Sequence, residues 1–270
     1  MLRFVVDGAS SDQLLRHLPA VDQQDPKSPT QPSSHDPPRV YWIFKNMDFE
    51  RWQSTQGSEV LWISGPAECD IPEASSRIVK LAMETPSELQ HSVLYFFCSS
   101  APMKASMAIA FVSTIIRQLI SLPELKEEVT PVFLQGLLDE ILNGEPLTNQ
   151  ELSRFKRDDS VEATVKKILS ATSDGYWGAL RAVMRIFPEH RLSLIIDGLD
   201  KAEQQNYEFI REVRGFVEFL QERTLTTKVL LTSRPQAAIK TILSGLPCVE
   251  YDRERRGLIH YFFILKTEYG

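Results

Sequence analysis

Five short apolar runs, separated by longer polar or amphipathic stretches, dominate the pattern of the chain. They cover residues 60–65, 93–98, 192–197, 229–233 and, more weakly, 248–251. The runs are apolar without alternation, which is typical of parallel strands covered on both faces. We therefore expect five buried parallel β-strands.

Helical patterns fill the stretches between these runs. Apolar or aromatic residues recur at helical spacing within residues 41–52, 109–119 and 209–220. Residues 124–190 predict three further helices, one of them opening with a capping box formed by Asp159 and Glu162. Strands that alternate with helices predict an α/β fold, a doubly wound parallel sheet of about five strands flanked by helices in a three-layer α/β/α arrangement.

The beginning of the chain has a different composition. Residues 19–38 are rich in Pro, Ser, Gln and Asp, and such a segment cannot bury enough apolar surface to offset its chain entropy. We expect a flexible N-terminal extension and linker over residues 1–38, a globular domain over 39–265 and a short tail over 266–270.

Charge and cysteine usage exclude several classes of protein. The net charge of −6 gives no general attraction to nucleic acid or to an anionic membrane, and no apolar stretch approaches the length of a membrane span. The three cysteines lie far apart without CxxC spacing, so neither a disulfide framework nor a zinc site is expected. We expect a cytoplasmic protein.

The run at residues 192–197 ends in an aspartate and continues as Gly198-Leu199-Asp200. An aspartate at the end of an apolar strand holds Mg²⁺ beside the β- and γ-phosphates in P-loop NTPases. Asp197 is therefore the candidate Mg²⁺ ligand, and Asp200 is a second candidate for the same site. Helix capping by either aspartate would explain the same pattern.

The run at residues 229–233 has a polar tip that is followed by Arg234 and Pro235. A guanidinium at the end of a strand suits a phosphate, because its planar donors match the phosphate oxygens. Arg234 is therefore a candidate for contacting a γ-phosphate. An ion pair between Arg234 and a neighbouring carboxylate is the alternative.

Together these motifs resemble fungal NACHT and STAND proteins, in the branch similar to the nephrocystin-3 N-terminal domain. The matching segments are residues 42–52, 60–65, 95–99, 196–200 and 232–235. The resemblance implies a P-loop NTPase-like fold in a signalling protein that binds Mg-ATP or Mg-GTP and acts through protein partners or self-association.

The phosphate loop departs from the family motif G-x-x-x-x-G-K-[ST]. Counting from Gly65 places Asp70, Ile71 and Pro72 at the second glycine, the lysine and the hydroxyl position. A three-residue insertion would bring in Ser75 and Ser76, which restores hydroxyls but neither glycine nor lysine. We keep Gly65, Ser75 and Ser76 as candidate nucleotide-binding residues.

These departures weaken phosphate binding. A missing lysine removes a charge-assisted hydrogen bond worth about 1.5–3 kcal/mol, which is roughly ten- to a hundredfold in affinity. Pro72 lacks an N–H donor, and three acidic residues bring negative charge to the loop: Glu68, Asp70 and Glu73. The spacing of Asp70 and Glu73 predicts a capping box in which Asp70 is the N-cap and takes the N–H groups that a phosphate would bind.

The position after Asp200, which is usually acidic in the family, is occupied by Lys201. We therefore interpret the chain as a degenerate nucleotide-binding module that acts by protein interaction, with no catalytic residue assigned. The alternatives are an active ATPase or GTPase in which Arg77 or Lys80 supplies the phosphate charge, and a remnant that folds only with a partner.

Overall fold

The structure is a computed structural model of the 270-residue chain. It describes residues 18, 40–84, 92–100, 106–122, 173–185, 191–205, 207–222 and 226–251. The expected linker over 19–38, the capping box at Asp159 and Glu162, and the tail over 266–270 lie outside the described residues. The chain divides into two compact units, one built around a β-sheet and the other around helices.

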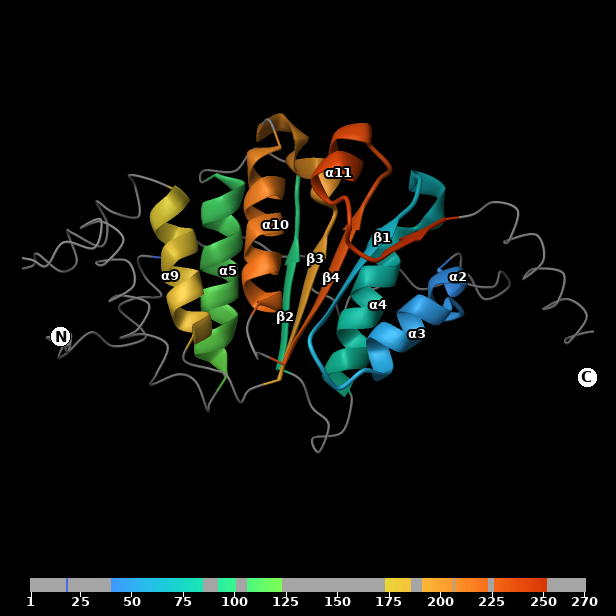
Figure 1. Cartoon of the computed structure of the whole chain (residues 1–270), viewed down its shortest axis with the longest axis horizontal. Coiled ribbons are helices and arrows are strands. Elements are labelled where there is room, and N and C mark those ends of the chain that lie inside the picture. The colour runs from blue at the N-terminus through green and yellow to red at the C-terminus, as the bar shows by residue number, and fades with distance from the viewer. Residues whose placement is uncertain are drawn as a thin grey trace, which may run out of the picture. The chain divides into compact units, whose positions relative to one another are not determined.

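The first unit contains a five-stranded sheet whose strands all run parallel (Figure 1). The strands are β1 (Glu59–Ser64), β2 (Ser92–Phe97), β3 (Leu192–Asp197), β4 (Thr227–Ser233) and β5 (Cys248–Glu250). Their order in the sheet is β2-β3-β4-β1-β5. Each of the five apolar runs forms a strand, and the predicted class, a doubly wound parallel α/β fold with flanking helices, is confirmed.

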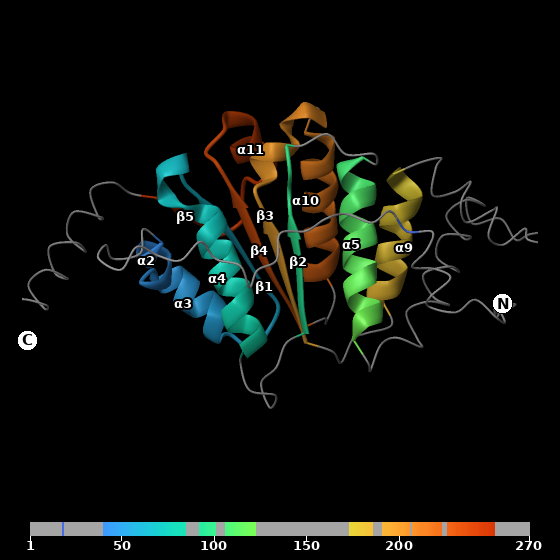
Figure 2. The same cartoon turned by 180° about the vertical axis from the view of Figure 1, so that it is seen from behind.

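The remaining elements of this unit are short helices and one long helix. They are α2 (Tyr41–Phe44), α3 (Met47–Ser54), η1 (Ala67–Cys69), α4 (Ile71–Glu84), η3 (Leu199–Gln205) and α11 (Ala237–Ile242). The extended backbone of Asn46 starts α3, and its side chain accepts hydrogen bonds from Asp48 N at 2.8 Å and Phe49 N at 3.3 Å. Figure 2 shows α3 and α4 lying against the strands.

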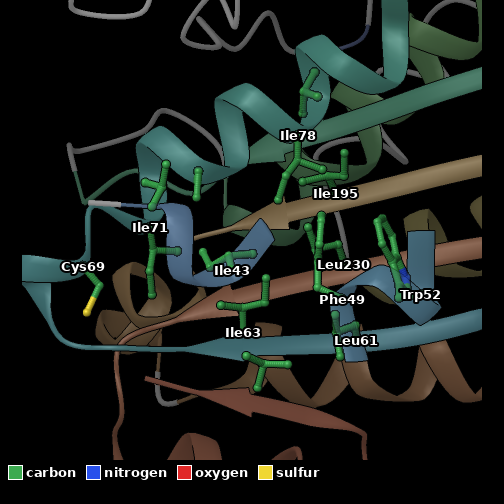
Figure 3. Close-up of a cluster of buried hydrophobic side chains, with 14 of the residues drawn as sticks. Ile43, Phe49, Trp52, Leu61, Ile63, Cys69, Ile71, Ile78, Ile195 and Leu230 are labelled. Carbon is green, nitrogen blue, oxygen red and sulfur yellow. The ribbon is translucent and has the colours of Figure 1, made fainter. Parts of the chain in front are cut away.

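The core of this unit lies between the sheet and the helices α2, α3 and α4. Side chains of a strand point alternately to the two faces of a sheet. Leu61, Ile63, Ile195 and Leu230 share the face that packs on these helices (Figure 3). The same alternation places Ser193, Asp197, Lys228 and Thr232 on this face, at its two edges.

The second unit contains α5 (Met107–Ser121), α9 (Ser173–Arg185) and most of α10 (Glu208–Gln221). Phe111, Trp177 and Phe216 join the three helices, with ring centroids 5.2 Å apart for Phe111–Trp177 and 5.6 Å for Trp177–Phe216. Trp177 Nε1 donates a hydrogen bond to Glu212 Oε2 at 2.6 Å. The helices predicted within 109–119 and 209–220 are confirmed. Helix α9 lies within the stretch where three helices were expected, and much of that stretch is outside the described residues.

The part of the chain that the structure describes contains no helix that is both long and apolar enough to cross a membrane.

Candidate functional site

The strand order brings the predicted motifs to one edge of the sheet. Strand β4 lies between β1 and β3, so the carboxyl ends of these three strands are adjacent. Gly65 follows β1, Asp197 ends β3 and Arg234 follows β4. Parallel α/β sheets bind their ligands at the carboxyl ends of the strands.

The carboxylate of Asp197 is at the centre of this edge. It is 1% exposed and its Oδ1 accepts two hydrogen bonds at 2.7 Å, one from the Ser75 hydroxyl of α4 and one from the Thr232 hydroxyl of β4. Thr232 Oγ1 in turn accepts the Gly198 N–H at 3.0 Å. Asp197 therefore links three separate elements of the fold.

The second oxygen of Asp197 faces the ammonium of Lys201. Asp197 Oδ2 is buried, has no hydrogen-bond donor among the described residues, and lies 3.8 Å from Lys201 Nζ. The lysine side chain bends over Gly198: a Cβ placed on that glycine would lie 3.1 Å from both Cε and Nζ of Lys201. Gly198 also has a φ of 75°, which favours glycine. The left-handed backbone therefore favours glycine beside this ion pair, and the missing Cβ leaves space for the end of the lysine side chain.

Side chains of the chain itself pack closely against Gly65, the residue that follows β1. A Cβ placed on Gly65 would lie 3.1 Å from Ile71 Cδ1, 3.2 Å from Tyr251 Cβ and 3.3 Å from Cys69 Sγ. Cys69 and Ile71 belong to the buried apolar cluster of Figure 3. Two backbone hydrogen bonds anchor the end of β1, one from Gly65 N to Ser233 O at 3.2 Å and one from Tyr251 N to Ser64 O at 2.9 Å.

The structure differs from the predicted capping box at the start of α4 in the backbone of Asp70 and in the partner of Glu73. Asp70 has φ 47° and ψ 42°, a left-handed conformation, whereas an N-cap residue is extended. Its N–H is directed to Ala67 O at 3.5 Å, and Glu73 Oε1 pairs with Arg77 at 2.5 Å instead of reaching back. The 3-10 helix η1, absent from the predicted pattern, turns the chain so that Asp70 closes it.

The two serines of α4 have different surroundings. Each hydroxyl lies near a carbonyl of its own helix, Ser75 at 3.1 Å from Ile71 O and Ser76 at 3.0 Å from Pro72 O, but only the fully buried Ser75 also reaches Asp197. Of the two hydroxyls that the sequence offered, the structure therefore brings only Ser75 to the predicted Mg²⁺ ligand.

Arg234 and Asp200 pair with each other. Asp200 Oδ1 accepts the Arg234 N–H at 2.9 Å, and the guanidinium Nε lies 3.6 Å from Asp200 Oδ2. The Arg234 side chain is 62% exposed. The alternative interpretation of this arginine, an ion pair with a neighbouring carboxylate, is the arrangement in the structure.

Cys98, which carries a buried thiol, directly follows β2, the strand that pairs with the Asp197 strand β3. Cys98 N donates to Asp197 O at 2.9 Å, and burial, followed by the charge of Asp197, raises the pKa of the Cys98 thiol. Within the described residues no three side chains of the His, Cys, Asp or Glu type gather as a metal site.

A parallel sheet in this order, with a glycine loop, an aspartate and an arginine at its carboxyl edge, defines a P-loop-like α/β nucleotide-binding fold. The family model described as "Nephrocystin 3, N-terminal" matches residues 40–234, well over half of the chain. The chain therefore belongs to the nephrocystin 3 N-terminal family, a NACHT-like region of the nucleotide-binding class. No curated protein matches the sequence.

Proposed function

We propose that this domain is a degenerate member of its family, a module whose nucleotide site is closed by its own side chains and which acts by protein interaction. The observation that carries the proposal is the set of contacts that the Asp197 carboxylate makes. Its two oxygens face two hydroxyls and an ammonium of the same chain.

The loop after β1 does not fit a phosphate. A phosphate loop needs converging N–H groups and a cation. Here Ile71 occupies the lysine position and is buried, and Pro72 has no N–H. The three side-chain atoms within 3.3 Å of the Gly65 Cβ position are two carbons and a thiol sulfur, so none of them offers an N–H donor to an anion.

The Mg²⁺ position is matched by a cation of the chain. Lys201 Nζ lies 3.8 Å from the one oxygen of Asp197 that has no hydrogen-bond donor within the described residues. An ammonium there offsets the buried carboxylate charge, which is the task of a metal ion in a nucleotide-bound relative. Lys201, which neutralises Asp197, stands at the position where the family usually has an acidic residue.

The cations proposed for an active enzyme have other partners. Arg77 pairs with Glu73 at 2.5 Å, and Lys80 lies 3.9 Å from Glu84 with its side chain 48% exposed. Both pairs are i,i+4 pairs along α4. The geometry therefore favours the closed module over an ATPase or GTPase with an unorthodox loop.

Titration calorimetry with Mg-ATP, Mg-ADP and Mg-GTP tests this proposal. We expect a Kd at or above about 1 mM, which corresponds to only about −4 kcal/mol. The sedimentation behaviour of the protein should be the same with and without nucleotide, and phosphate release should equal the buffer blank.

A low-micromolar Kd that disappears in Asp197→Ala would show that the site is functional and would refute the proposal. A thermal shift that grows with nucleotide concentration would lead to the same conclusion, because ligand binding to the folded state stabilises it by RT ln(1 + [L]/Kd).

A further inference from the structure

A cavity of about 260 Å³ lies at the amino edge of the sheet, at the other end of the strands from Asp197. Trp52 and Phe49 of α3 form one wall, and Ile78 and Leu81 of α4 form another. Figure 3 shows Trp52 and Cys69 at opposite ends of the apolar cluster, so the cavity is separate from the loop after β1.

The cavity carries positive charge. Lys228 and Arg191 line it, and none of its lining residues is acidic. Residues 193 and 228 sit near the start of β3 and β4, on the same face as Ile195 and Leu230. The alternation that places Asp197 and Thr232 at the carboxyl edge therefore places Ser193 and Lys228 at the amino edge.

Lys228 is an unusual residue for a structural role alone. It is 5% exposed, and lysine is almost never buried to that extent unless it is paired. Its Nζ donates to Gln53 O at 2.6 Å and lies 5.8 Å from the centre of the Trp52 ring. An ammonium has three donors, and the backbone carbonyl of Gln53 uses one.

The acidic residue closest to Lys228 in the sheet is engaged elsewhere. Glu59 is the register partner of Lys228 on β1, and its carboxylate lies 3.5 Å from Arg51 Nε. Burial lowers the pKa of Lys228, and Arg191 lowers it further, while Glu59 opposes both. The cavity therefore holds a desolvated cation whose charge a bound anion would stabilise.

We propose that this cavity binds a small organic anion, a carboxylate or phosphate carried on a single flat apolar ring. The anionic group would contact the free donors of Lys228 and the guanidinium of Arg191, and the ring would lie against Trp52 and Leu81. The volume equals that of about nine water molecules in the liquid, which suits one ring and its substituent. Aromatic and aliphatic walls with a few convergent polar groups are the usual composition of ligand sites.

The competing explanation is that Lys228 only caps the end of α3. Gln53 O is one of the last carbonyls of that helix, and a lysine often satisfies such a carbonyl. Capping accounts for the single hydrogen bond to Gln53 but not for Arg191 on the same cavity. Binding of an anion separates the two roles.

Calorimetry on the full chain with phenyl phosphate and benzoate tests the proposal, with benzyl alcohol and inorganic phosphate as references. We expect at least one ring-bearing anion to bind at least tenfold more tightly than both references. Whichever of phenyl phosphate and benzoate binds more tightly identifies phosphate or carboxylate as the preferred group. No detectable binding of either anion up to about 10 mM, or equal binding of benzyl alcohol, would refute the proposal.

Variants locate the site. Lys228→Met should weaken anion binding at least tenfold, and Leu81→Trp should do the same by filling the cavity from an exposed position, since Leu81 is 47% exposed. Lys80→Met, which removes an exposed lysine outside the cavity, should bind like the parent protein. If Lys228→Met does not fold, Arg191→Gln and Leu81→Trp decide. Unchanged affinity in these folded variants would overturn the proposal.

Discussion

The ammonium of Lys201 lies 3.8 Å from the buried Oδ2 of Asp197, which is four residues earlier in the chain. Gly198 between them lets the lysine side chain bend back, because any larger residue would meet Cε and Nζ of Lys201. The candidate Mg²⁺ ligand is thereby paired with a cation that cannot dissociate. This relationship connects the proposed closed site to the stability of the domain.

Lys201→Met should destabilise the domain, because it leaves the Asp197 charge buried without a counter-ion. Since the Lys201 side chain is 32% exposed, we expect a loss of about 1–2 kcal/mol in the free energy of unfolding. Urea unfolding measures it. The control is Lys80→Met, which should change stability by less than about 0.5 kcal/mol because its pair is exposed. Equal small losses in both variants would mean that the Lys201–Asp197 pair contributes nothing.

The two serines of α4 provide a matched comparison. Ser75→Ala removes a buried hydrogen bond to a carboxylate and should cost about 1–2 kcal/mol after the better helix propensity of alanine is included. Ser76→Ala removes a bond within the helix and should stay within about 0.5 kcal/mol of the parent. Chemical denaturation of both variants checks this order. A reversed order would mean that Ser75 does not support Asp197.

Gly65→Ala tests how tightly the loop after β1 is packed. The new methyl group would lie 3.1–3.3 Å from three side-chain atoms, so we expect a loss of about 1–3 kcal/mol from overpacking. At Gly57 a Cβ would meet only Thr55 Cγ2 at 3.9 Å, and Gly57→Ala should be close to neutral. Melting temperatures of the two variants make the comparison. If Gly65→Ala were as stable as Gly57→Ala, the packing around Gly65 would be loose, contrary to the proposed closed site.

Periodicity and apolar runs predicted most of the fold. The run at 192–197 matches β3 at both ends, and the other four strands agree with their runs to within about two residues. Such runs are informative because strands of a parallel sheet are buried on both faces and must be apolar throughout. The order of the strands then follows from pairing across the sheet, which connects residues far apart in the chain.

The site was predicted only in part. The motifs singled out Asp197, which ends β3, Asp200, which lies three residues beyond that end, and Arg234, which directly follows β4. The spacing of Asp197 and Lys201 contained a signal for their pairing, but i,i+4 spacing indicates contact only if the backbone between them turns, which here requires the left-handed Gly198. The left-handed backbone of Asp70 was not predicted, because it lies at the end of η1, and a three-residue helix leaves little trace in a pattern of apolar positions.

The thiol of Cys98, whose backbone N–H donates to Asp197 O, should make the stability of the domain depend on pH. Burial, and then the nearby carboxylate, raise the pKa of this thiol well above the value of about 8.5 for an unfolded chain. A folded-state pKa above the unfolded value gives stability that is complete below the unfolded pKa and is lost as the pH rises toward the folded pKa. The free energy of unfolding should therefore fall above about pH 8.5 by about 1.4 kcal/mol per pH unit for this thiol.

Cys98→Ala removes that contribution, so its stability should fall less steeply than that of the parent between about pH 8.5 and 10. The comparison of slopes isolates Cys98, because Cys248, whose pKa is raised to about 11 by burial and Glu250, titrates equally in both proteins. Lys228, whose pKa is lowered by burial, also contributes equally to both. Urea unfolding across this pH range gives the slope of the unfolding free energy against pH for both proteins. In a second experiment, an aromatic disulfide reagent should leave Cys98 unlabelled in the folded parent at pH 8. If the parent and Cys98→Ala lost stability equally with pH, or if Cys98 were labelled rapidly, the thiol would not be buried against the Asp197 backbone.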